Sequence, residues 1–147
     1  MRCVLGFLVT AVCLSGLTPP ASAQERPYTE GPVVAVSYIR VKPGMFDKYM
    51  KYLDTDYKRV MEAQKKEGVI LDYAVYQSPK TQQDDWNILL TVTYKNMAAL
   101  DNLRDRSEPI MLRTTNRTSD QAAQAAIERE SMREAAGSRL LRQLILR

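Results

Sequence analysis

The sequence contains no histidine, and it has only two cysteines, Cys3 and Cys13. Without histidine, Ser-His-Asp and Cys-His catalytic arrangements, imidazole-based zinc sites and a His-ligated haem are excluded. Both cysteines lie in an N-terminal segment that we expect to be removed, so thiolate sites are excluded from the mature chain too. A carboxylate-only metal site could still form, but Asp84 and Asp85 lack EF-hand spacing and are interpreted as a solvated turn. We therefore predict no metal and no cofactor.

Strong charge of one sign is also missing. The chain has 21 Lys and Arg against 17 Asp and Glu, a formal net charge of +4. The basic residues alternate with acids, as over residues 58–67, and this pattern is typical of a solvated helix face rather than a clustered nucleic-acid surface. There is no Gly-rich phosphate loop of either common type. We therefore predict no nucleic-acid partner.

The one long apolar run lies at the N-terminus. Arg2 precedes an almost unbroken apolar segment over residues 4–14, and small residues at Ala21 and Ala23 fit a cleavage site. The run is shorter than the roughly 20 residues that a spanning helix needs. We predict a signal peptide at residues 1–23, export to the periplasm or the medium, and no membrane span after cleavage. Residues 24–32 are expected to be a flexible lead-in to one domain at residues 33–147.

Residue periodicity predicts an α+β domain. β-branched and aromatic residues predict strands at residues 33–41, 69–77 and 86–94. Apolar residues at three- and four-residue steps predict a long helix over residues 45–66 that ends at Gly68. The later elements are a helix that begins after Asn96, a third helix over residues 120–136 capped by Ser119 and ended by Gly137, and a last strand at residues 140–146, where a short helix would also fit.

This order predicts a ferredoxin-like split βαβ unit, in which an antiparallel sheet carries its helices on one face and an extra helix precedes the last strand. The other sheet face would expose large apolar side chains of the second and third strands. Because a small domain rarely leaves such a surface in water, we predict a homodimer.

The turn Val41-Lys42-Pro43-Gly44, entered from a β-branched strand and followed by a helix that starts at Phe46, resembles the dimeric α+β barrel superfamily. This superfamily includes antibiotic-biosynthesis-monooxygenase-like and NIPSNAP-like domains. The resemblance covers residues 33–102 and implies two sheets paired face to face, with a pocket between each sheet and its helices. The monooxygenases among these relatives act on aromatic substrates without metal or flavin.

The candidate pocket or dimer-interface residues are those on the predicted strands whose side chains end in a polar group. Arg40 and Asp72, with a tyrosine, could bind a carboxylate or polarise a carbonyl, but our interpretation is that Arg40 and Asp72 form an interstrand or intersubunit ion pair. Tyrosines on the long helix could form an aromatic box, but core packing is our interpretation of them. The full candidate set is Tyr38, Arg40, Asp72, Tyr73, Tyr76, Trp86, Tyr94 and Arg142.

Three functional hypotheses remain. The first is an exported homodimer that binds a small apolar or aromatic molecule or serves as a structural module. The second is a cofactor-independent, monooxygenase-like enzyme with a small aromatic substrate. The third is an accessory subunit of another exported protein, docked through residues 120–136. No catalytic motif decides between them.

Overall fold

Four strands form one antiparallel sheet in the order β2-β3-β1-β4. The computed structural model describes residues 26–79 and 85–147, so the predicted signal peptide and Asp84 lie outside it. β1 (Tyr28–Val41) pairs with β3 (Ile88–Tyr94) on one side and with β4 (Arg133–Leu146) on the other. β2 (Asp72–Gln77) pairs with the far side of β3. Helices connect β1 to β2 and β3 to β4, which confirms the predicted ferredoxin-like topology.

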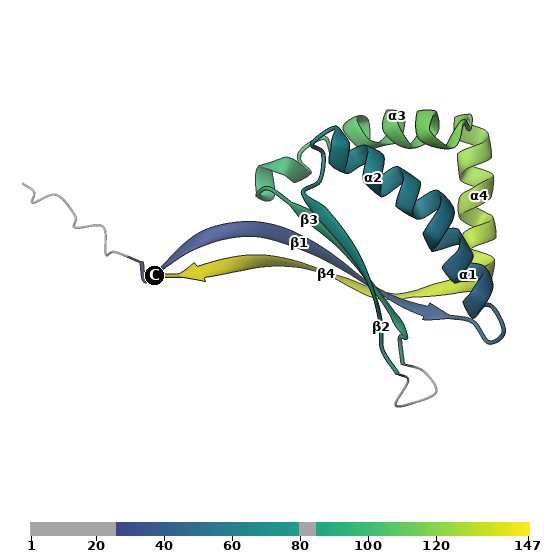
Figure 1. The fold of residues 1–147 in the computed structure, drawn as a ribbon, viewed down its shortest axis with the longest axis horizontal. Coiled ribbons are helices and arrows are strands. Elements are labelled where there is room, and N and C mark those ends of the chain that lie inside the picture. The colour runs from purple at the N-terminus through teal and green to yellow at the C-terminus, as the bar shows by residue number, and fades with distance from the viewer. Residues whose placement is uncertain (1–25, 80–84) are drawn as a thin grey trace, which may run out of the picture.

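The helices lie on one face of this sheet (Figure 1). The predicted long helix is present as α1 (Phe46–Tyr52), a π-helical turn η1 (Leu53–Tyr57) and α2 (Lys58–Lys66). Beside the π-helical turn, the Thr55 hydroxyl donates a hydrogen bond to the Lys51 carbonyl at 2.8 Å. Such side-chain bonds compete with the main-chain ladder. No helix in residues 26–79 or 85–147 is long and apolar enough to cross a membrane.

The remaining helices follow β3. Asn96 caps a short 3-10 turn, η2 (Met97–Leu100), by accepting a hydrogen bond from the Ala99 N–H at 3.0 Å. α3 (Leu103–Thr115) continues through Pro109, and α4 (Ser119–Met132) follows after a short connection. The cap of α4 is Thr118 rather than the predicted Ser119. Thr118 and Gln121 form a reciprocal capping box that satisfies two N–H groups.

Two apolar clusters join the helices to the sheet. The first lies below α1 and η1, and the second lies where α2 and α3 meet β3. The buried members of the first are Ile39, Val41, Tyr49, Leu53, Ile88 and Met132, and those of the second are Val69, Ile70, Tyr94 and Ile110. Val69 and Ile70 precede β2, so the strand predicted from residue 69 begins only at Asp72.

The prediction for the C-terminal region is wrong at one boundary. The third helix ends at Met132 rather than at residue 136, and β4 begins at Arg133. Residues 133–135 pair instead with Val41, Arg40 and Ile39 of β1. β1 itself begins at Tyr28, inside the predicted flexible lead-in. The two strands therefore run side by side well beyond the helical layer (Figure 1).

Gly137 lies inside β4 with φ +144°, next to a register shift in the β1–β4 pairing. An added Cβ would meet only the Tyr38 ring at 3.9 Å, so space is adequate and the backbone conformation is the constraint. We expect Gly137→Ala to lower the free energy of unfolding by about 1–3 kcal/mol, because this region of φ is strained for any residue with a Cβ. Urea unfolding at fixed protein concentration measures the loss. Ser138→Ala is the control, and a Gly137→Ala protein as stable as wild type would contradict the argument.

The sheet face opposite the helices is not covered by any segment in the described ranges. Because side chains alternate along a strand, Val34, Leu89 and Leu141 share this face. The Tyr38 and Trp86 rings meet there edge to face, with centroids 5.2 Å apart. Leu141 is 50% exposed. This face is therefore open to a partner.

Candidate functional site

A cavity of about 430 Å³ lies within the helical layer. Its walls come from the α1–η1–α2 helix, from α3 and from α4, and no strand residue lines it. The lining residues are Tyr52, Asp56, Tyr57, Val60, Met61, Gln64, Arg104, Ser107, Glu108, Met111, Thr115, Arg117, Ala122, Ala125, Ala126 and Arg129. Its volume is within the usual range for small-molecule sites, about 300–1,000 Å³.

The π-helical turn supplies the aromatic wall of the cavity. Tyr57 packs edge to face on Tyr73, with ring centroids 5.9 Å apart. Its hydroxyl is buried and has no hydrogen-bond partner among the described residues. Burial, followed by neighbouring tyrosines, raises the pKa of Tyr57 well above its usual value. The phenol therefore stays neutral. π-Helical turns such as η1 often occur at functional sites.

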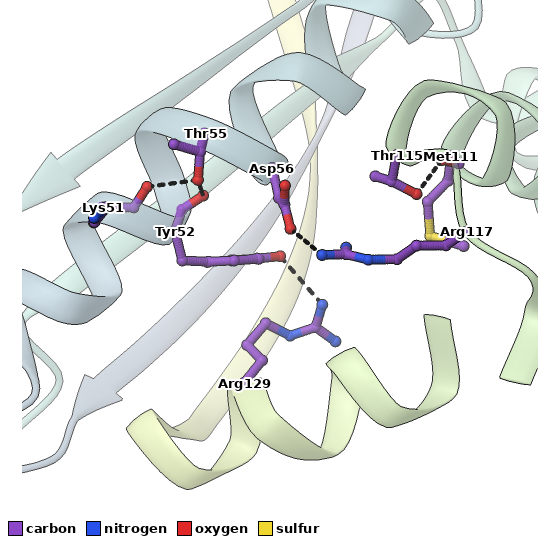
Figure 2. A network of polar contacts seen from close by, with 8 residues as sticks. All are labelled: Lys51, Tyr52, Thr55, Asp56, Met111, Thr115, Arg117 and Arg129. Atoms are coloured by element: carbon purple, nitrogen blue, oxygen red, sulfur yellow. Dashed lines mark hydrogen bonds and ion pairs between the residues drawn. The ribbon is translucent and has the colours of Figure 1, made fainter. Parts of the chain in front are cut away.

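Arginines form the polar wall (Figure 2). Arg117 donates to the Asp56 carboxylate at 2.6 Å. Arg129 Nη1 donates to the Tyr52 hydroxyl at 3.2 Å, and its guanidinium lies 5.9 Å from the centroid of the same ring. These contacts connect α4 and the α3–α4 connection to the first helix, and they place both guanidinium groups beside the cavity.

Local structure fixes where Arg117 lies. Asn116 ends α3 in the left-handed conformation, with φ 52°, and the capping box at Thr118 starts α4. Arg117 is the single residue between them, and its own N–H donates to the Leu112 carbonyl at 3.1 Å. Its backbone is therefore held at both sides, which directs the side chain toward Asp56.

None of the residues that the sequence suggested lines this cavity. Arg40 pairs with Glu134 at 3.1 Å, and Asp72 pairs with Lys65 at 2.7 Å. β3 separates β1 from β2, and the register places Arg40 and Asp72 at opposite ends of the sheet. Within one chain, the structure therefore forms neither the Arg40–Asp72 ligand group nor an interstrand ion pair between these two residues.

The remaining candidates are spread over both sheet faces. Tyr73 faces the helices and donates to Glu62 at 2.7 Å, and burial together with this carboxylate raises its pKa to about 12. Tyr94 is a core residue whose pKa is raised by burial. Tyr76 is exposed, and Arg142 forms an ion pair with Glu30.

Strict alternation along the strand predicted at residues 86–94 would place Trp86 and Tyr94 on one face, but the structure places them on different faces. β3 begins at Ile88, and residues 85–87 precede it without strand structure. Asn87 instead accepts a hydrogen bond from the Val41 N–H at 2.9 Å. The irregular backbone breaks the alternation, so the Trp86 ring meets Tyr38 whereas Tyr94 enters the core.

Sequence reasoning missed the helical cavity because its signal is ambiguous. Tyr49, Tyr52 and Tyr57 were interpreted as core packing, and this holds for Tyr49, which is fully buried. The other two line the cavity. Arg129 lies 77 residues beyond Tyr52, and no local pattern in the sequence reports that contact.

Comparisons with known proteins bear on the fold. No protein-family model and no curated protein matches the sequence. HapK from Hahella chejuensis is similar in structure, with 12% identity and a TM-score of 0.51, over 76% of this chain and 91% of that chain. A Bacteroides thetaiotaomicron protein of unknown function, described as a possible oxidoreductase, has 15% identity and a TM-score of 0.44 over 80% and 100% of the two chains. A dimeric ferredoxin-like protein of unknown function from Thermobifida fusca has 9% identity and a TM-score of 0.41 over 80% and 94%.

At these identities the likeness to HapK shows the fold alone. It agrees with the strand order and with helices on one face of an antiparallel sheet. The chain is thus a small α+β domain of ferredoxin-like fold.

Proposed function

We propose that this protein is an exported homodimer that binds a small apolar or aromatic molecule in the cavity of its helical layer. The observation that carries the proposal is the cavity itself, at about 430 Å³, with apolar and aromatic side chains and a few arginines in its walls. A pocket with mostly apolar walls and a few convergent polar groups is the usual form of a ligand site.

Two further parts of the proposal have separate support. The apolar run and small-residue cleavage site within residues 1–23 support export. The uncovered sheet face supports dimerisation, since it carries Val34, Leu89 and the half-exposed Leu141. The resemblance of residues 33–102 to dimeric α+β barrels favours the same face-to-face pairing.

Binding is favoured over turnover by the state of the acidic groups. Asp56 is engaged by Arg117, and Glu108 is engaged by Arg104 at 3.1 Å. Tyr57 is held in its neutral form by burial. A general base must be available to accept a proton, and neither the paired carboxylates nor the neutral phenol is poised for that role.

The test is titration with naphthamide, a neutral aromatic probe, followed by calorimetry. We expect binding to wild type and its loss in Ala126→Trp, because the indole occupies the cavity. Ala123→Trp adds the same ring to an exposed position on α4 outside the lining and is expected to retain binding. Absence of binding to wild type, or equal binding to Ala126→Trp, would refute the cavity as the ligand site.

A further inference from the structure

The charges around the cavity are unequally compensated. Asp56 and Glu108 are the acidic residues in the lining, and each forms an ion pair with an arginine of the same lining. Arg129 is the remaining arginine of that wall. Within the cavity, its contact is the neutral hydroxyl of Tyr52. The lining therefore carries one more positive charge than its own carboxylates balance.

Residues outside the lining compensate the positive charge of Arg129 only weakly. Its Nε lies 3.9 Å from Glu130 Oε1, beyond hydrogen-bond distance, and the same oxygen accepts a hydrogen bond from Arg133 Nη2 at 3.0 Å. The Nε atom is buried and donates no hydrogen bond to any described residue. The Arg129 side chain is 32% exposed, so much of its guanidinium has exchanged water for protein.

A partly dehydrated guanidinium whose nearest carboxylate is already bound by another arginine is best satisfied by a planar anion. Carboxylates accept two parallel N–H bonds from arginine, and such charge-assisted pairs are stronger than neutral hydrogen bonds. The Tyr52 ring lies beside the same guanidinium, and Tyr57 lines the same cavity. Charge and aromatic surface are thus presented together, as Figure 2 shows for Tyr52 and Arg129.

We propose that the ligand of the helical cavity is an aromatic carboxylate, with its carboxylate on Arg129 and its ring against the Tyr52–Tyr57 wall. This inference rests on the proposed binding function and goes one step further by assigning the anionic class of the ligand. If the ligand is an aromatic carboxylate, Arg129 is the specificity-determining residue, because the apolar walls do not distinguish a neutral aromatic molecule from an anionic one.

The experiment compares naphthoate with the neutral naphthamide at neutral pH. In wild type we expect naphthoate to bind about tenfold more tightly, as one added charge-assisted hydrogen bond predicts. In Arg129→Gln we expect the two probes to bind equally. Arg129→Lys keeps the charge but loses the planar fork, so an intermediate preference is expected. Thermal melting establishes that each variant is folded.

Arg59→Gln is the control for net charge. Arg59 lies on the exposed side of α2 and does not line the cavity, so its variant is expected to keep the full preference for naphthoate. Equal affinity of wild type for both probes, or a preference that survives in Arg129→Gln, would overturn the carboxylate assignment while the binding proposal stands. If neither probe binds, both proposals fail together.

Discussion

Ile39→Ala is expected to lower the free energy of unfolding by about 2–5 kcal/mol, the usual cost of a large-to-small change in a packed core. Ile39 is 1% exposed and belongs to the cluster that joins α1 and η1 to the sheet. It lies opposite Ile88 on β3 and opposite Ala135 on β4. Truncation therefore leaves a cavity at the junction of three strands, where neighbouring strands limit relaxation.

Urea unfolding measures this loss, and the protein concentration must be held constant because the proposed dimerisation would contribute to apparent stability. Ile127→Ala is the control, since Ile127 is 65% exposed on α4 and should cost less than about 0.5 kcal/mol. Equal effects of the two substitutions would mean that the described core is not the main source of stability.

Local sequence patterns predicted the sheet and the first helix correctly. The β-branched run that ends at Val41 forms the C-terminal part of β1, and the apolar steps of residues 45–66 form the α1–η1–α2 helix. These elements follow from local periodicity, since one face of each must be buried whatever the rest of the chain does. The antiparallel ferredoxin-like topology followed from the order of strands and helices along the chain.

The same reasoning failed where long-range pairing overrides local preference. Glu134, Ala135 and Ala136 are acceptable helix formers, and their composition predicted a helix that continues to Gly137. Pairing of Ala135 with Ile39 satisfies backbone groups along β1 that a helix would have left unpaired. The sequence alone does not show whether residues 133–136 continue the helix or pair with the edge of β1.

The cavity was hidden for a different reason. A tyrosine that faces the core and one that faces a cavity have the same spacing along a helix, so Tyr49 and Tyr57 cannot be separated by periodicity. What distinguishes them is the distance between α2, α3 and α4. That distance depends on contacts such as Arg117–Asp56, which join residues 61 positions apart.

The proposed dimer leads to an expectation for two leucines on β4. Leu141 and Leu144 are nearly equally exposed, at 50% and 51%. They lie on opposite faces of the strand, because side chains alternate along β4 and the register shift between Glu30 and Val33 adds its extra residue to β1, not to β4. Leu141 shares the uncovered sheet face with Val34, whereas Leu144 lies on the face that carries the helices. The same substitution made at each leucine in turn therefore tests the two faces of the sheet separately.

Leu141→Asp is expected to convert the dimer to monomer, as light scattering measures over a range of protein concentrations. A carboxylate buried without a partner in an apolar interface costs several kcal/mol, and a two-fold axis would introduce it twice. The side chain is half exposed in the single chain, so the monomer should remain folded, with its circular dichroism unchanged. Leu144→Asp should stay dimeric. If Leu144→Asp dissociates instead, the partner covers the other side of the β1–β4 ribbon. If both variants remain dimeric, β4 lies outside the interface and face-to-face pairing of the sheets is refuted.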